Sequence, residues 1–180
     1  TVKPWRFDIA RNTALALVPA DVDVCVSVDM DEWLQPGWRE VIDAAWDPEQ
    51  FGSGKLTLKF VDSEEPNANV TLEYLIDRIH AREGSKWVLP CHEVAVNMYK
   101  PGIIIPQMVI HHLPAQGKDR AGRDTPLLEL GVRENPNDAR ALYYYARELF
   151  YIGKWDIGRN AFLKYLNLPE AGFDQERDAN

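Results

Sequence analysis

An acidic cluster, Asp29-Met30-Asp31-Glu32, follows directly on the largely apolar segment 22–28. A run of β-branched and small apolar residues is typical of a strand that is covered on both faces. In open α/β sheets ligands bind outside the carboxyl ends of strands, which is where these carboxylates would lie. Carboxylate oxygens are the donors that Mg²⁺ and Mn²⁺ prefer, usually together with substrate phosphates. A solvated acidic turn is the alternative, because D-x-D is a common chance motif.

Two later segments carry groups suited to proton transfer or metal binding. Glu93 follows His92 within KWVLPCHEV, and a carboxylate at a strand end is a candidate general base for a hydroxyl group. The alternative is a surface glutamate beside a hydrogen-bonded core histidine. His111 and His112 end an apolar segment, and neighbouring residues of a strand point to opposite faces, so at most one of them faces a given site. An imidazole completing an Asp-rich site would favour Mn²⁺ over Mg²⁺.

The segments that must position these residues have sequence patterns that predict an α/β fold. Residues 8–18 predict a short packed helix before the buried strand, and residues 37–46 predict an amphipathic helix after it. Between residues 52 and 114, apolar segments separated by turn residues predict the strands of an antiparallel or mixed sheet. Residues 135–169 have the apolar spacing of two helices joined by a turn at Gly153.

The stretch FDIARNTALALVPADVDVCVSVDMDEWLQPGW resembles a segment of the family-2-like nucleotide-sugar glycosyltransferases of GT-A fold. In that family an A-R-N helix precedes a buried strand that ends in D-x-D, and both motifs stand here where the pattern expects them. The resemblance implies a partial GT-A-like mixed sheet. It also implies Asp31 as the direct metal ligand, Asp29 near the metal or the nucleotide ribose, and Arg11 near the donor.

Other segments extend this resemblance. KWVLPCHEV is similar to the strand-borne W-x-G-x-x-H-E of glycosyltransferases that carry a tetratricopeptide tail, with Pro90 where Gly is common, and this implies Glu93 as the base. VIHHLP is similar to the strand that supplies a late histidine to the metal, which implies His112. The helical segment resembles one tetratricopeptide unit. We therefore expect a GT-A-like catalytic portion at residues 1–120 and a tetratricopeptide-like helical tail at residues 121–180.

The expected activity is that of a metal-dependent glycosyltransferase that uses Mn²⁺ or Mg²⁺. It would transfer a sugar from a nucleoside-diphosphate donor to a hydroxyl of a carbohydrate or protein acceptor, with inversion implied by the resemblance. The chain lacks the nucleotide-binding half that precedes the A-R-N helix in a whole GT-A enzyme. We therefore expect a truncated portion, a sheet completed by a second chain or by self-association, or a half-fold without activity. The alternatives are a non-catalytic protein-interaction module derived from a glycosyltransferase, and a metal-dependent hydrolase.

Composition excludes several other classes. The 180 residues suffice for one domain with a small helical appendage, and 46% hydrophobic residues support a buried core. A formal charge of −8 gives no electrostatic drive toward nucleic acid or anionic lipid. Cys25 and Cys91 lie in apolar runs typical of buried free thiols, and no segment has the length and apolarity of a membrane span. These features predict a cytoplasmic protein without a nucleic-acid partner or a membrane span.

Overall fold

A computed structural model describes residues 5–114 and 121–171, except for the side chains of residues 121–123. The protein has a mixed α/β fold with flanking helices and C-terminal helices, as predicted. Its residues form two compact units. Unit 1 comprises Thr1–Asn12, Val88–Val94 and Lys118–Asn180, and unit 2 comprises Thr13–Trp87 and Ala95–Gly117. The predicted boundary between residues 120 and 121 lies at the end of the segment 115–120, which is outside the described residues, so this boundary stays a prediction. The GT-A-like character of the sheet also stays a prediction.

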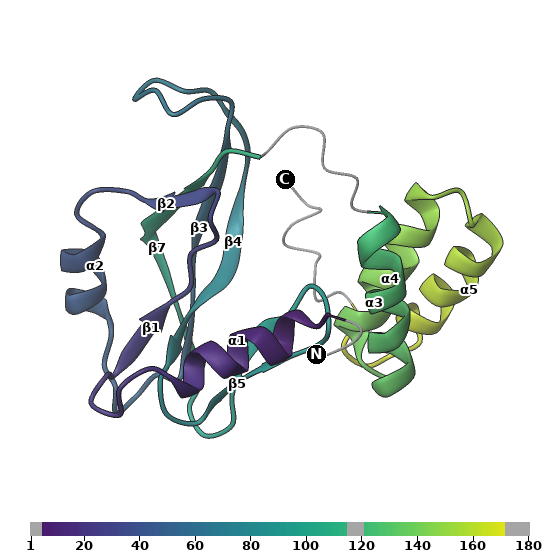
Figure 1. Ribbon diagram of the computed structural model, residues 1–180, viewed down its shortest axis with the longest axis horizontal. Coiled ribbons are helices and arrows are strands. Elements are labelled where there is room, and N and C mark those ends of the chain that lie inside the picture. Colours follow the sequence, from purple (N-terminus) through teal and green to yellow (C-terminus); the bar gives the residue numbers. More distant parts are fainter. Residues whose placement is uncertain (1–4, 115–120, 172–180) are drawn as a thin grey trace. The chain divides into compact units, whose positions relative to one another are not determined.

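Unit 2 is built on a curled five-stranded sheet with the strand order β1-β4-β3-β7-β2 (Figure 1). β3 and β7 run parallel, and the other neighbours run antiparallel, so the sheet is mixed as predicted. The strands are β1 (Val24–Val26), β2 (Glu32–Leu34), β3 (Ser53–Val61), β4 (Val70–Ala81) and β7 (Gly102–His112). β5 (Ser85–Val88) and β6 (Val94–Asn97) form a separate two-stranded sheet.

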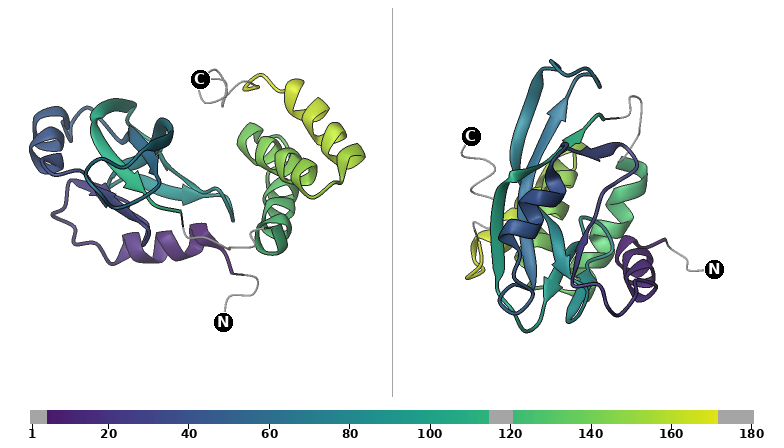
Figure 2. Two further views of the ribbon diagram at one scale, coloured as in Figure 1. Left: turned by 90° about the horizontal axis from the view of Figure 1, so that it is seen from above. Right: turned by 90° about the vertical axis from the view of Figure 1, so that its left-hand side faces the viewer.

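The core of unit 2 lies between the sheet and helix α2 (Trp38–Ala45), which packs beside β7 (Figure 2). Ile42 on the apolar side of α2 is buried against the sheet. The fully buried sheet residues of this core are Leu56, Leu58, Ile79, Ile105, Met108 and Ile110. Gly37 precedes α2 with φ 88°, a left-handed conformation that glycine adopts without steric cost. The core fixes the register of β3 and β7, because a slip of one residue would turn their buried faces outward.

Strand β1 differs from its prediction. The apolar run 22–28 predicted a strand covered on both faces, but β1 spans Val24–Val26 and all three residues are only half-buried. The reason is its position: β1 pairs with β4 at an edge of the five-stranded sheet. An apolar run alone therefore did not distinguish an edge strand from a central one.

In unit 1 the helices are α3 (Ala121–Glu134), α4 (Ala139–Tyr151) and α5 (Trp155–Leu166), and α1 (Phe7–Ala16) begins in this unit. Asp138 caps α4 by accepting a hydrogen bond from the backbone N–H of Ala141 at 2.8 Å. The predicted turn at Gly153 is confirmed, with φ 76° between α4 and α5.

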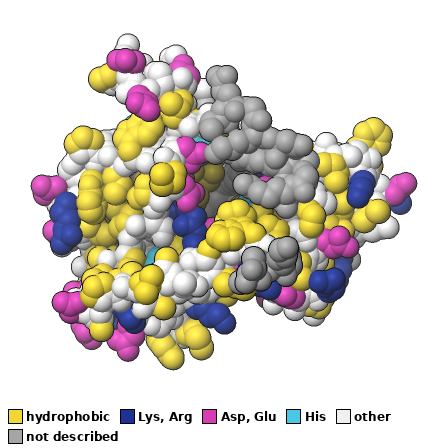
Figure 3. Space-filling view, viewed as in Figure 1, with side chains coloured by type: hydrophobic (Ala, Val, Ile, Leu, Met, Phe, Trp, Pro, Cys, Tyr) yellow, Lys and Arg dark blue, Asp and Glu magenta, His cyan; other side chains and the backbone are white. Residues whose placement is uncertain are grey.

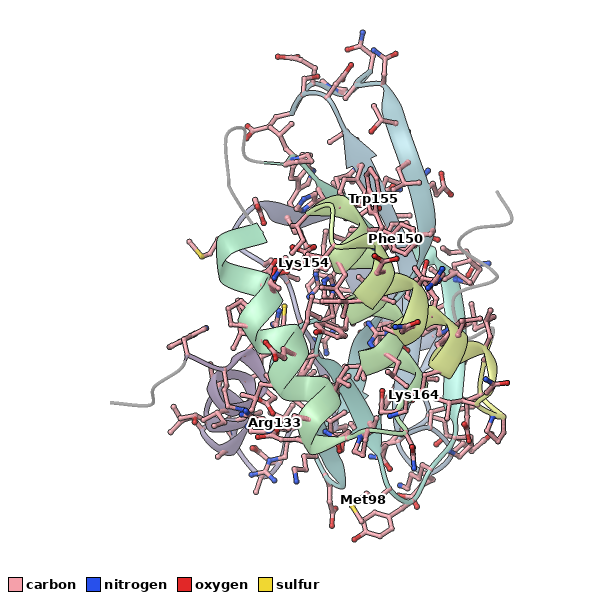
Figure 4. The ribbon with its side chains drawn as sticks, turned by 90° about the vertical axis from the view of Figure 1, so that its right-hand side faces the viewer. Met98, Arg133, Phe150, Lys154, Trp155 and Lys164 are labelled. Atoms are coloured by element: carbon pink, nitrogen blue, oxygen red, sulfur yellow. The ribbon has the colours of Figure 1, made fainter. Side chains whose placement is uncertain are left out.

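The helices of unit 1 pack through two groups of side chains. Leu127 and Leu128 of α3 pack with Tyr144 of α4, whereas Leu142 of α4 packs with Tyr165 of α5. Phe150, Lys154 and Trp155 gather where α4 turns into α5, and Lys164 lies toward the other end of α5 (Figure 4). None of the helices in the described part of the chain is long and apolar enough to cross a bilayer.

Candidate functional site

The pairing of β2 with β7 brings the acidic cluster to the late histidines. The two strands run antiparallel with Glu32 opposite His112, Trp33 opposite His111 and Leu34 opposite Ile110. The backbone N–H of Leu113 also donates to the carbonyl of Asp31 at 3.2 Å. A solvated acidic turn was the alternative for this segment, and the structure shows that its last residue, Glu32, begins strand β2.

His112 faces two carboxylates of the cluster. Its Nδ1 lies 3.8 Å from Oδ1 of Asp31 and 3.7 Å from Oε1 of Glu32. The His112 side chain is only 10% exposed, and its Nδ1 has no hydrogen-bond partner within the described part of the chain. A buried polar atom without a partner is uncommon and calls for an explanation. Asp31 and His112, predicted as metal ligands, are therefore neighbours in space.

Arg78 of β4 ties the same cluster together. Its Nη2 donates to Oδ2 of Asp29 and to Oε1 of Glu32, both at 2.7 Å. Glu32 is nearly fully buried, with a side chain 2% exposed, and its other oxygen accepts from the backbone N–H of Asp29 at 2.9 Å. The carboxylates of Asp29, Asp31 and Glu32 and the guanidinium of Arg78 therefore lie together at this place.

An open depression of about 570 Å³ adjoins the cluster. The described residues that line it are Met30, Asp31, Glu32, Trp33, Glu64 and Leu113. Three of these are acidic and none is basic. Figure 3 shows acidic side chains gathered over the turn between β3 and β4, the turn that contributes Glu64. The described part of the wall is therefore acidic, which suits a cationic or hydroxyl-bearing ligand.

The donor set is compatible with a metal ion held by few protein ligands. Among the described residues, no three His, Cys, Asp or Glu side chains are arranged to hold a metal by themselves. Two ligands at about 2.0–2.2 Å from one ion lie about 3–3.5 Å apart, so the 3.8 Å between Asp31 and His112 needs only a small side-chain rotation. Mg²⁺ is commonly held by one or two carboxylates plus substrate phosphates. Asp31 and His112 would therefore supply only two ligands to such an ion, and they do not form a closed protein cage.

Arg11 and Glu93 belong to unit 1, where they contact each other. Nε of Arg11 donates to Oε1 of Glu93 at 2.5 Å, and both side chains are largely buried. Glu93 follows His92, which has a left-handed backbone with φ 51° and stacks on Tyr144 with 4.0 Å between ring centroids. The sequence assigned these two residues separate roles, whereas the structure joins them in one ion pair. Their roles toward a donor and an acceptor stay predictions.

The other histidines of unit 2 have structural surroundings. His111 stacks on Trp33 with 5.5 Å between ring centroids, so the adjacent histidines do point to different neighbours, as alternation along a strand requires. Burial, assisted by the nearby Lys59, lowers the pKa of His111. His80 is buried, and its ring contacts the carbonyl of Ala81 and the ring of Trp87. Burial raises the pKa of the Cys25 thiol, which is typical of a packing cysteine.

Sequence reasoning missed Arg78 and the structural role of Glu32. The available signal was a charged pair, Asp77-Arg78, between the apolar residues Ile76 and Ile79. Arginine is rarely buried unless it is paired, so such a residue indicates a carboxylate partner elsewhere in the chain. Nothing local identifies that partner, which lies 46 positions away along the chain.

Comparison of the sequence with protein-family models and with curated proteins gives no match.

Proposed function

We propose that the chain is a metal-dependent glycosyltransferase, or the catalytic-site half of one. It would transfer a sugar from a nucleoside-diphosphate donor to a hydroxyl group of a carbohydrate or protein, with inversion at the anomeric carbon. The observation that carries this proposal is the approach of the His112 imidazole to Asp31 beside a depression whose described lining includes three acidic residues. The sequence resemblance supports the same assignment, because it implies these two residues as ligands.

Asp31 and His112 would supply a carboxylate oxygen and an imidazole nitrogen to Mn²⁺ or Mg²⁺. Such an ion supplies positive charge that stabilises the leaving diphosphate. In the transfer, the acceptor oxygen bonds to the anomeric carbon, the bond from that carbon to the diphosphate oxygen breaks, and the acceptor proton passes to a carboxylate. The sequence resemblance implies Glu93 for that last role; in the structure Glu93 belongs to unit 1 and forms an ion pair with Arg11. A cytoplasmic location, and a second chain or a second copy at the β1 edge, belong to the same proposal.

Thermal unfolding of the protein with UDP, GDP, CDP or dTDP, each with and without Mn²⁺, tests the cation site. A nucleotide at about 100 times its Kd stabilises the folded protein by about 2.7 kcal/mol. For a chain of this length, 1 kcal/mol shifts Tm by about 2–4 °C, so we expect a shift of about 5–10 °C that requires Mn²⁺. Asp31→Ala should abolish the shift. Asp43→Ala on the exposed side of α2 is the matched control and should retain it.

A Mn²⁺-dependent shift that survives Asp31→Ala would remove Asp31 as the ligand. The absence of any nucleotide-dependent shift would favour the second candidate, a non-catalytic protein-interaction module. One observation favours that module: Phe150, Tyr151 and Trp155 lie near one end of the α4–α5 pair with exposures of 42%, 75% and 67%. Exposed aromatic side chains gathered in this way are common at protein interfaces.

A further inference from the structure

Arg78 occupies an unusual place for an arginine. It lies within strand β4 and its side chain is only 10% exposed. Its Nε has no hydrogen-bond partner within the described residues, and its terminal nitrogen Nη2 donates to the acidic cluster. A buried guanidinium costs free energy of desolvation, which is recovered only through well-placed carboxylate partners.

The two partners of Arg78 flank Asp31 in the sequence. One nitrogen, Nη2, holds Asp29 on one side and Glu32 on the other. Two hydrogen bonds close the turn between them: Asp29 N–H donates to the Glu32 carboxylate at 2.9 Å, and Glu32 N–H donates to the Asp29 carbonyl at 3.1 Å. The backbone on both sides of Asp31 is therefore fixed to β4 through Arg78.

We infer that Arg78 is a positioning residue of the cation site: it engages Asp29 and Glu32 and so fixes the turn in which Asp31 faces His112. This inference rests on the cation site proposed above and divides the acidic cluster into roles. Asp31 supplies the carboxylate to the cation. Glu32, which pairs with His112 across the two strands, holds Arg78. Asp29, which the sequence placed near the metal or the ribose, serves mainly as the second anchor of Arg78.

Two physical effects of Arg78 on a cation have opposite signs, and this makes the inference testable. As a positive charge close to the site, Arg78 repels a cation, so its removal should tighten cation binding if electrostatics alone matters. As a positioning residue, it holds the turn, so its removal should weaken binding. Loss of a residue that orients metal ligands commonly reduces metal affinity about 10–100-fold.

Lysine is the informative replacement because it keeps the charge and loses the planar geometry. The guanidinium presents several N–H donors in a rigid fork, whereas an ammonium is a compact point charge on a flexible stem. We expect Arg78→Lys to bind Mn²⁺ about 10-fold more weakly, and Arg78→Met about 10–100-fold more weakly, than the unaltered protein. Arg82→Lys is the matched control: it makes the same change just after β4, where Arg82 donates to the carbonyl of Val18.

The assay is a titration of the full chain with Mn²⁺, with and without UDP, in which electron paramagnetic resonance measures the free ion. Circular dichroism of each variant reports whether it is folded. If the unaltered protein binds no Mn²⁺ under either condition, the proposed cation site fails and this inference fails with it. If the unaltered protein binds Mn²⁺ and a folded Arg78 variant binds it equally or more tightly, the inference alone is overturned.

A second pair of variants decides the matter if the Arg78 variants do not fold. Asp31→Asn and Asp29→Asn remove the same charge from the same turn, at side chains that are 26% and 39% exposed. We expect Asp31→Asn to weaken Mn²⁺ binding at least 10-fold more than Asp29→Asn. An equal or larger loss for Asp29→Asn would show that Asp29 is the ligand and would refute the division of roles.

Discussion

Replacement of Glu32 by glutamine is the sharpest test of how the acidic cluster is held together. The Glu32 side chain is 2% exposed, and it accepts from Arg78 at 2.7 Å and from the backbone of Asp29 at 2.9 Å. Glutamine preserves the shape but removes the charge and one of the two acceptor oxygens. Breaking a buried ion pair from one side costs about 3–5 kcal/mol, and because glutamine keeps one acceptor we expect about 3 kcal/mol.

Asp29→Asn provides the contrast within the same cluster. It removes the other partner of Arg78, but the Asp29 side chain is 39% exposed, so solvent screens the pair. Exposed pairs contribute about 0–1 kcal/mol, and we expect a loss of about 0.5 kcal/mol. Burial, and not the equal distances of the two hydrogen bonds, then sets the difference of about 2–3 kcal/mol between the variants.

Tryptophan fluorescence during urea unfolding is the suitable measurement. Trp33, Trp38, Trp46 and Trp87 lie in unit 2, so the signal reports mainly on the unit that holds Glu32. Glu49→Gln, at an exposed position of unit 2, is the matched control and should be neutral within about 0.5 kcal/mol. A Glu32→Gln variant as stable as this control, or no more destabilised than Asp29→Asn, would refute the view that the buried pair fixes the turn.

Two further predictions concern residues outside the cation site. The pKa of His111 is lowered by burial and then by Lys59, so below pH about 6.5 the unfolded chain binds a proton that the folded chain does not, and stability falls as the pH drops. His111→Phe, which keeps a ring against Trp33, should lose that part of the pH dependence; urea unfolding at pH 8, 7, 6 and 5 checks this, and parallel pH profiles would contradict it. Leu142→Ala, at a side chain 1% exposed between α4 and α5, should cost about 2–5 kcal/mol in helix unfolding followed by circular dichroism. Leu163→Ala, at an exposed position of α5, should cost less than about 0.5 kcal/mol, and similar losses for both variants would show that the α4–α5 contact does not depend on Leu142.

Helices, turns and strand faces could be predicted wherever the pattern that specifies them lies within a few neighbouring residues. Apolar spacing predicted the pair of C-terminal helices, and Gly153 predicted their turn because glycine adopts positive φ without steric cost. Alternation along a strand predicted that His111 and His112 have different surroundings, and the structure shows one on Trp33 and the other facing Asp31. The acidic cluster itself was also visible as carboxylates after an apolar run.

The position of β1 and the role of Glu32 did not follow from the sequence. An apolar run has the same composition in a central strand and in an edge strand, and only the pairing with β4 made β1 an edge. Glu32 appeared as part of a turn because three residues of strand carry too little periodicity to identify it. Its pairing with β7 depends on a partner strand about 80 positions later in the chain.

The sequence by itself determined which chemical groups are available: carboxylates, an imidazole and a guanidinium. It also set the helix and strand propensities of the segments that carry them. The tertiary structure decided which of them meet. The antiparallel register of β2 and β7 placed Asp31 beside His112, and burial of Arg78 under the turn joined Asp29 to Glu32. Register and burial arise from contacts between distant segments packed on one core, and no window of neighbouring residues contains that information.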